Sequence, residues 1–241
     1  HAKYVKMALE SGKHVFVEKP LCLTRAELDE ITECYIDMVN NRSIRAPRLM
    51  VGFNRRYAPL TKKLKKILMS ISGPKLINVR VNAGRVSASH WTQDPSKGGG
   101  RIIGESCHFV DLIRFLIDDD IVSVSKTFAD LNTGDTAIFT MKFADGSVAC
   151  LTYFSIGSRS IGKEIIEIHG DGRTFVLDNY LSIRSWSSGL ERLFSIGRRQ
   201  NKGQLECVEN FMSSIKTGEC ITDPQEFLAS MRLTFDLAEI D

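Results

Sequence analysis

Short apolar runs that directly follow helical patterns set the strongest constraint on the fold of this chain. Residues 2–11 and 25–40 repeat apolar side chains at helical spacing, and the runs over 14–17 and 48–53 follow them after short links. A continuous apolar run of this length is typical of a parallel strand that is buried on both faces. Helix, strand, helix and strand in this order predict the C-terminal part of a doubly wound (Rossmann) α/β domain, which we assign to residues 1–56.

The pattern changes after Arg56, where alternating strand signals replace the buried runs. A helix is predicted over residues 58–71, and turn signals at Asp145-Gly146 and at 170–172 predict two hairpins. We therefore assign residues 57–241 to an α+β domain with an open, mostly antiparallel sheet. Its predicted strands are 75–83, 136–143, 148–154, 163–169 and 174–178, and its further helices are 104–117, 204–216 and 224–238.

Charge patterning argues against two classes of partner. The 32 basic and 29 acidic residues give a formal net charge of +3, which offers no electrostatic case for binding nucleic acid or an anionic membrane. The lysines of the run 62–66 oppose an apolar stripe of the predicted helix, so they form either a solvated face or a polyanion patch. No apolar run approaches the roughly 18 residues that a membrane-spanning helix needs.

The cysteines bear on the compartment in which the protein resides, and the chain ends bear on whether the sequence is part of a longer polypeptide. The six cysteines form no C-x-x-C pair, so the spacing typical of zinc sites and redox pairs is absent. An even number would allow disulfides, but without a secretory signal free thiols in a reducing, cytoplasmic compartment are favoured. The chain lacks an initiator methionine, opens inside a helical pattern and ends without a helix-stop signal. We therefore expect it to be a piece of a longer polypeptide.

Glu18, Lys19 and Pro20 directly follow the first predicted strand. Doubly wound domains bind ligands at the carboxyl ends of their strands. This tripeptide is therefore either part of a binding site, with Lys19 as the candidate proton-transfer group, or an ordinary solvated loop.

A glycine-rich segment precedes the helix predicted over 104–117. Gly98, Gly100 and Gly104 resemble a dinucleotide fingerprint in spacing, but a polar turn precedes them in place of the strand that the fingerprint needs. Glycines at the start of a helix instead allow another backbone or a ligand to approach closely.

Glu105, His108 and Asp111 recur at every third position of the same predicted helix and share one face. His108 is therefore either a general acid/base between two carboxylates or a histidine that a neighbouring aspartate satisfies. Cys107 is its neighbour in sequence but points in a different direction, so the two do not form a nucleophile pair.

Three motifs in succession carry a resemblance to a known family. The first begins at His1 and ends in Lys13-His14-Val15-Phe16-Val17-Glu18-Lys19-Pro20, and the second is Val51-Gly52-Phe53-Asn54-Arg55-Arg56-Tyr57. The third comprises Trp91, Asp94, Pro95, Gly98, Gly99, Gly100, His108 and Asp111. In this order they resemble the glucose–fructose oxidoreductase/inositol dehydrogenase/MocA family over essentially the whole chain.

The resemblance implies an oxidoreductase that transfers a hydride between NAD or NADP and a sugar, a sugar nucleotide or a cyclic polyol. It implies that Lys19 polarises or deprotonates a substrate hydroxyl and that His108 binds the reacting oxygen as acid/base. The cofactor-binding residues that it implies are His1, Glu18, Lys19, Pro20 and Asn54, often with a cis peptide bond before the proline. The substrate-binding residues that it implies are Arg56, Trp91, Glu105 and His108.

Two departures from the family pattern leave alternatives open. In the family, the glycine-rich phosphate loop and the acidic residue that binds the ribose hydroxyls come before the position of His1. We therefore expect this chain alone not to hold a dinucleotide. Many members carry an aspartate four residues before the histidine, where this chain has Gly104, and Glu105 would need a different rotamer to replace it. The alternatives to a hydride-transferring oxidoreductase are a non-catalytic binding or assembly module of the same fold and an NAD-dependent glycosidase.

The expected open sheet also predicts self-association. An antiparallel sheet with helices on one face leaves its other face to be covered. We therefore predict a homo-oligomer that forms through the C-terminal sheet.

Overall fold

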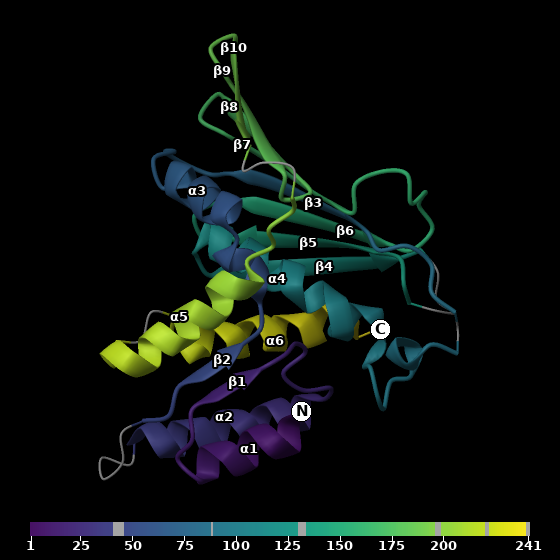
Figure 1. Ribbon diagram of the computed structural model, residues 1–241. Helices are drawn as coiled ribbons and strands as arrows, with labels where there is room; N and C mark the ends of the chain where they lie inside the picture. The colour runs from purple at the N-terminus through teal and green to yellow at the C-terminus, as the bar shows by residue number, and fades with distance from the viewer. Residues whose placement is uncertain (41–45, 88, 130–133, 196–198, 220–221, 240–241) are drawn as a thin grey trace. The chain divides into compact units, whose positions relative to one another are not determined.

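The computed structural model describes residues 1–40, 46–87, 89–129, 134–195, 199–219 and 222–239. The chain folds into two compact units, which we describe separately (Figure 1). The first unit comprises His1–Asn54, Trp91–Asp111 and Gln204–Asp241, and the second comprises Arg55–His90 and Leu112–Gly203. These units group the chain differently from the domain ranges 1–56 and 57–241, which stay a prediction about the domains.

The first unit contains the alternating segment expected from the sequence. Its order is α1 (Ala2–Glu10), β1 (Val15–Val17), α2 (Arg25–Asn40) and β2 (Leu49–Val51). The two strands pair in parallel, with Val15 opposite Leu49 and Val17 opposite Val51. The prediction of a doubly wound α/β segment is thereby confirmed.

The N-terminus of α2 shows why its start was predictable from sequence. The Thr24 hydroxyl accepts a hydrogen bond from the Glu27 main-chain N–H at 3.2 Å, and the Glu27 carboxylate accepts one from the Thr24 N–H at 3.3 Å. This reciprocal pair is a capping box. Leu28, Ile31 and Tyr35 then repeat on the buried face of the helix.

Two C-terminal helices complete the first unit, α5 (Gln204–Thr217) and α6 (Pro224–Ala238). Asp223 caps α6 by accepting a hydrogen bond from the Gln225 N–H at 2.9 Å, and α6 packs against α2 and β2. Phe227 of this helix lies against Phe53, with ring centroids 6.1 Å apart. In Figure 1, β1 and β2 lie between α1 and α2 on one side and α5 and α6 on the other.

The second unit is built on an open sheet, which has eight strands within the described residues. The strand order is β10-β9-β8-β7-β3-β6-β5-β4, and β3 with β6 is the one parallel pair among the pairings of this sheet. The mostly antiparallel, open sheet predicted from the sequence is confirmed. Its strands are β3 (Leu76–Asn82), β4 (Ile121–Phe128), β5 (Ala137–Phe143), β6 (Val148–Phe154), β7 (Glu164–Gly170), β8 (Arg173–Asp178), β9 (Ser182–Ser187) and β10 (Leu190–Ser195).

Helix α3 (Pro59–Leu68) belongs to the second unit and buries Leu60, Leu64 and Leu68. The opposing lysines contact side chains of the same unit. Lys65 pairs with the Asp118 carboxylate at 2.9 Å, and the Lys63 ammonium lies 3.7 Å from the centroid of the Phe194 ring. Cation–π contacts and ion pairs of this kind are ordinary for lysines on a helix surface.

A buried charge cluster also belongs to the second unit. The Glu164 carboxylate is fully buried and receives Arg55 Nη2 at 2.9 Å and Lys202 Nζ at 2.6 Å. Burial alone would raise the pKa of Glu164, but the two cations outweigh burial and lower it. The carboxylate is therefore ionised inside the unit.

Three further findings concern the described residues as a whole. None of their helices is both long enough and apolar enough to cross a membrane. No group of three or more histidine, cysteine, aspartate or glutamate side chains among them is arranged to hold a metal ion. The cysteines described are Cys22, Cys34, Cys107, Cys150 and Cys207, and none of them is in a disulfide. Cys220 lies outside the described residues.

Candidate active site

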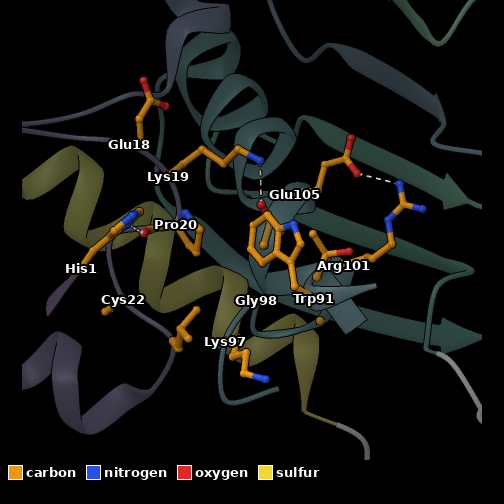
Figure 2. Close-up of a pocket in the computed structure, with 14 residues that line it drawn as sticks. His1, Glu18, Lys19, Pro20, Cys22, Trp91, Lys97, Gly98, Arg101 and Glu105 are labelled. Carbon is orange, nitrogen blue, oxygen red and sulfur yellow. Dashed lines mark hydrogen bonds and ion pairs between the residues drawn. The ribbon is translucent and has the colours of Figure 1, made fainter. Parts of the chain in front are cut away.

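A cavity of about 390 Å³ in the first unit brings together residues from distant parts of the sequence (Figure 2). It opens where the chain leaves β1, at the carboxyl end of that strand. The lining residues are His1, Glu18, Lys19, Pro20, Cys22, Leu23, Trp91, Thr92, Lys97, Gly98, Gly100, Arg101, Gly104 and Glu105. Six of the nine site residues predicted from the sequence are in this set: His1, Glu18, Lys19, Pro20, Trp91 and Glu105.

Lys19 is half-buried at the cavity wall and is held by a main-chain acceptor. Its ammonium group donates a hydrogen bond to the Gly104 carbonyl oxygen at 2.7 Å. Among the described residues no carboxylate forms an ion pair with Lys19. The peptide bond that follows it, Lys19–Pro20, is cis, as the family resemblance implied.

His1 and Glu18 line the cavity beside the Lys19–Pro20 peptide bond, and each contacts a different part of the chain. His1 Nδ1 hydrogen-bonds the Pro20 carbonyl oxygen at 2.7 Å, and because a carbonyl only accepts, Nδ1 carries the hydrogen. Glu18 lies against Gly52, where an added Cβ would stand 2.9 Å from the Glu18 Oε2 atom. Gly52 of the second motif therefore leaves the space that Glu18 of the first motif occupies.

The glycine-rich segment forms the opposite wall through close backbone packing. A Cβ at Gly98 would stand 2.5 Å from the Thr92 Cα atom, and a Cβ at Gly104 would stand 2.7 Å from the Gly98 carbonyl oxygen. Gly100 adopts a φ of +72°, in the left-handed region. The prediction of close backbone approach is confirmed at Gly98 and Gly104, whereas at Gly100 an added Cβ would meet no atom within 4 Å.

A turn centred on Asp94 carries this glycine segment. The Asp94 main-chain oxygen accepts a hydrogen bond from the Gly98 N–H at 2.8 Å. Its carboxylate accepts hydrogen bonds from the Ser96 hydroxyl at 2.6 Å and N–H at 2.9 Å, and pairs with Lys97 Nζ at 3.0 Å. The bonds from Ser96 and Lys97 lower the pKa of Asp94 to about 2. The carboxylate is charged in neutral solution and fixes the turn.

The helix predicted over 104–117 is interrupted at the cavity. Residues Ile102–Ser106 form a π-helical turn, and the regular helix α4 spans Cys107–Ile117. Single π-helical turns occur frequently at functional sites. Here the irregular turn contains both Gly104, whose carbonyl accepts the bond from Lys19, and Glu105, whose side chain lines the cavity.

Arg101 is a lining residue to which the sequence analysis gave no role. Its Nη2 atom donates a hydrogen bond to Glu105 Oε2 at 2.8 Å, and the two side chains are 6% and 18% exposed. Opposite charges four positions apart in a helical segment were the available signal. The structure therefore adds a half-buried ion pair to the predicted site.

His108 lies deeper than the other predicted site residues. It is 4% exposed, is not among the residues that line the cavity, and its ring packs edge-on against Phe53 with centroids 6.0 Å apart. Of the two acidic residues on its predicted face, Glu105 pairs with Arg101, and buried Asp111 accepts a hydrogen bond from the Ser230 hydroxyl at 3.1 Å. The catalytic role of His108 stays a prediction.

Asn54 and Arg56 belong to a short 3₁₀ helix, η1 (Asn54–Tyr57), and neither lines the cavity. Asn54 is 6% exposed. Arg56 is assigned to the second unit, where its guanidinium carbon lies 5.4 Å from the centroid of the Phe115 ring. Their predicted contacts with cofactor and substrate stay predictions.

Two thiols near the site, Cys22 and Cys107, are buried. Burial raises the pKa of both Cys22 and Cys107 to about 12. The thiolate is the nucleophilic form of cysteine. The expectation from the sequence that Cys107 and His108 do not form a nucleophile pair agrees with the buried environment of Cys107.

Two family models match this chain. The C-terminal alpha/beta domain model of the GFO_IDH_MocA oxidoreductase family matches residues 65–234, and the NAD-binding Rossmann fold model of the same family matches residues 1–39. The chain belongs to the Gfo/Idh/MocA oxidoreductase family. The resemblance seen in the three sequence motifs is thereby confirmed.

Individual Gfo/Idh/MocA relatives agree with this assignment. An uncharacterized oxidoreductase of Bacillus subtilis, YrbE, is 30% identical over 161 residues, which cover 63% of this chain and 44% of the relative. The myo-inositol 2-dehydrogenase of Thermotoga maritima is 24% identical over 235 residues, or 91% of this chain and 67% of the relative. The chain thus spans less than half of the first relative and about two thirds of the second.

Solved structures show the same fold. An oxidoreductase domain protein from Kribbella flavida superposes with a TM-score of 0.83 at 20% identity, covering 98% of this chain and 73% of its own.

Proposed function

We propose that this Gfo/Idh/MocA protein is a nicotinamide-dependent oxidoreductase that acts on a hydroxyl group of a sugar or cyclic polyol. The observation that carries the proposal is the convergence of Lys19 and residues of two distant motifs on one cavity at the end of β1. The match to an NAD-binding Rossmann model and the similarity to a myo-inositol 2-dehydrogenase support it. A reducing, cytoplasmic compartment fits such an enzyme.

The described residues fit the nicotinamide end of a dinucleotide. Glu18, His1 and the turn at Pro20 offer polar groups at the carboxyl end of a parallel strand, where doubly wound domains bind ligands. No described strand-to-helix turn of the first unit carries a glycine fingerprint, so we assign the pyrophosphate to none of the described residues.

Proton transfer is the part of the reaction that we assign to this chain. Bound nicotinamide supplies the hydride exchange. Lys19, held in place by the Gly104 carbonyl, hydrogen-bonds the substrate hydroxyl, and its uncharged amine form accepts the hydroxyl proton as the carbon is oxidised. Glu105 and Trp91 line the same cavity and bind the remainder of the substrate. His108 would have to approach the reacting oxygen to act with Lys19.

We further propose that the protein self-associates through the second unit's sheet. Ile138, Val148 and Leu76, on adjacent strands β5, β6 and β3, are 48%, 37% and 44% exposed. Exposed apolar side chains that gather on one sheet are typical of an interface. Light scattering that shows only a monomer at micromolar concentration would remove this part of the proposal.

Calorimetric titration of NADH and of NADPH tests the proposed function. It is performed on the 241-residue chain and on the chain extended by any upstream residues that its gene encodes. We expect micromolar binding of one nucleotide to at least the longer form, followed by reduction of NAD or NADP in the presence of a polyol. A folded longer form that binds neither nucleotide would overturn the proposal.

A non-catalytic module is the second candidate, and Gly104 favours it. Lys19 is bound there by a neutral carbonyl oxygen and not by a carboxylate. Nucleotide binding without turnover of any sugar or polyol would support this candidate. Release of free sugar without net formation of NADH would instead indicate a glycosidase.

A further inference from the structure

We propose that the second unit holds a separate binding site, in which Arg173 and Arg192 bind the anionic group of a small organic molecule. The molecule is a phosphate ester or a carboxylate whose apolar ring packs against Phe175 and Phe194. The site shares no lining residue with the cavity at the end of β1, and the inference does not depend on the proposed function.

The site is a cavity of about 340 Å³ that is lined by residues of α3, β8, β9 and β10. In Figure 1 these three strands form the end of the sheet beyond β7. Helix α3 packs against β9 and contributes Ile67 to the lining. Pockets for small molecules measure roughly 300–1,000 Å³, so a cavity at the lower end of this range suits a ligand built on a small ring system.

The strand register brings the polar side chains of this cavity together. Ser185 of β9 is opposite Arg192 of β10, and Ser187 of β9 is opposite Arg173 of β8. Residues that are paired across strands, or that are two positions apart on one strand, point to the same face. Neighbouring strands are about 4.8 Å apart, a distance that an arginine side chain spans. An anion at the two serines is therefore within reach of a guanidinium from either side.

The two arginines are available for an anion. Within the described part of the chain, Arg192 forms no ion pair and no hydrogen bond, and no carboxylate lines the cavity. Arg173 approaches a carboxylate oxygen of Asp171 at 3.9 Å, which is longer than a hydrogen bond. Both side chains of this pair are exposed to solvent, and such pairs are weak. The cavity therefore carries an excess of positive charge.

Two further groups favour an anion at the same place. Ser185 is buried, and among the described residues its hydroxyl makes no hydrogen bond, so this donor lacks a partner of its own. Lys63 of α3 adds a cation next to the cavity, because its ammonium group lies 3.7 Å from the centroid of the Phe194 ring. Guanidinium groups and hydroxyls are the donors with which proteins bind phosphate and carboxylate groups.

The apolar part of the lining distinguishes an organic anion from an inorganic one. Ile67, Phe175 and Phe194 line the cavity beside the arginines, and Phe175 is only 4% exposed. An inorganic ion would leave these side chains in contact with water. An anion that carries an apolar ring covers them and gains the free energy of their burial.

The cavity is on the opposite face of the sheet from the proposed interface between copies. Leu76, an exposed residue of that interface, is opposite His169, and His169 is opposite Thr174. Thr174 therefore points to the interface face, and its neighbours Arg173 and Phe175 point to the other face. The proposed site consequently stays accessible when copies pair through the interface face.

Calorimetric titration of the 241-residue chain tests the proposal. The compounds are 2-naphthyl phosphate, 2-naphthoate, the neutral 2-naphthamide and inorganic phosphate. The variants are Arg192→Gln, Arg173→Gln and Ser185→Ala. Arg184→Gln is the matched control, because it removes the same charge from an exposed arginine that neighbours Ser185 and points to the other face. Circular dichroism and thermal unfolding establish that each variant is folded.

We expect at least one naphthyl anion to bind one molecule per chain with a Kd below about 1 mM, and the amide and inorganic phosphate to bind at least about tenfold more weakly. Arg192→Gln and Arg173→Gln should each weaken binding of the anion by about tenfold or more, as the loss of a hydrogen bond between charged groups does. Ser185→Ala should weaken it by about threefold, and Arg184→Gln should bind as the wild type does. Preference for the phosphate would identify a phosphate ester as the ligand class, and preference for the naphthoate a carboxylate.

Three results would overturn the inference: no binding of either naphthyl anion, equal affinity for the amide, or an equal loss of affinity in Arg184→Gln. Light scattering tests whether a second copy fills the cavity instead. An oligomer that Arg192→Gln converts to a monomer, in a chain that binds neither anion, would show that the cavity belongs to a contact between copies.

Discussion

The ammonium group of Lys19 donates a hydrogen bond to the main-chain carbonyl of Gly104, a residue 85 positions away in the sequence, at 2.7 Å. The contact joins the turn after β1 to the π-helical turn before α4, so the first motif meets the segment that the third motif spans. Because the acceptor is a backbone atom, its position depends on the packing of the glycine segment around it.

That dependence predicts a strong effect of Gly104→Ala. The added Cβ would stand 2.7 Å from the Gly98 carbonyl oxygen, so one backbone segment must move. We expect a loss of about 1–3 kcal/mol of stability, as for other overpacked sites, together with reduced turnover. Chemical denaturation measures the first effect. Gly162→Ala is the control, since its Cβ would meet a side-chain oxygen, that of Asp178, at 3.3 Å and no backbone atom; an equal loss there would contradict the account.

The Asp94 turn predicts a specific acid titration. Its hydrogen bonds to Ser96 and Lys97 lower the pKa of Asp94 to about 2 from an ordinary value of 3.8. A carboxyl with a lowered pKa stabilises the fold above its ordinary pKa, and the contribution is lost as the pH falls toward 2. Carboxyl-carbon NMR should show Asp94 still ionised at pH 3. A titration midpoint near 4 would show that the turn does not hold the carboxylate.

Cysteine burial predicts a selective alkylation pattern. With pKa values near 12, Cys22 and Cys107 should not react with iodoacetamide at pH 8 in the folded protein. Cys150 is only partly buried and provides the internal control. Mass spectrometry after brief labelling should find Cys150 modified first, and all three modified after denaturation. Rapid labelling of Cys107 in folded protein would contradict its buried placement.

The buried Glu164 predicts a large and pH-dependent stability effect. Glu164→Gln leaves Arg55 and Lys202 without their shared anion, so we expect a loss of about 3–5 kcal/mol. Because the cations lower the pKa of Glu164, its stabilisation is complete above an ordinary carboxyl pKa and declines as the solution becomes more acidic. Denaturant unfolding at pH 7 and pH 4 measures both effects.

Glu167→Gln is the matched control for this cluster. Glu167 lies on the same strand, and its side chain is 44% exposed. Its replacement should change the free energy of unfolding by less than about 0.5 kcal/mol. Equal losses for the two variants would show that burial of Glu164 is not the cause.

Local signals made much of the fold predictable from sequence. Helix α2 was predicted over its observed range because the residues of its capping box and of its apolar face all lie within one short stretch of sequence. The hairpins β5–β6 and β7–β8 were predicted because turn residues separate alternating strands.

Strands without a distinct local pattern were not predicted. β4 exposes most of its residues, and β9 and β10 mix polar with apolar side chains, so no alternating pattern marks them in the sequence. Each of the three nevertheless pairs with a strand next to it in the sequence.

The candidate site was predictable only in part for the same reason. The first motif placed Lys19 at a strand end, and the family resemblance supplied its expected partners. The π-helical turn was not predicted, because it depends on packing between Gly98 and Gly104 that no helical periodicity encodes. Arg101 was missed as a lining residue because a single i, i+4 charge pair is common on ordinary helices.

The most direct test of the account is the steady-state turnover of Lys19→Met. The wild-type protein, in the form that binds a nicotinamide nucleotide, is compared with Lys19→Met and with Lys13→Met, which removes an exposed lysine six positions earlier. The account predicts that Lys19→Met lowers kcat at saturating nucleotide by about 10²- to 10⁴-fold, the usual contribution of a general acid or base, with Tm preserved. Unchanged kcat in Lys19→Met would contradict the assignment of this cavity as the site of proton transfer.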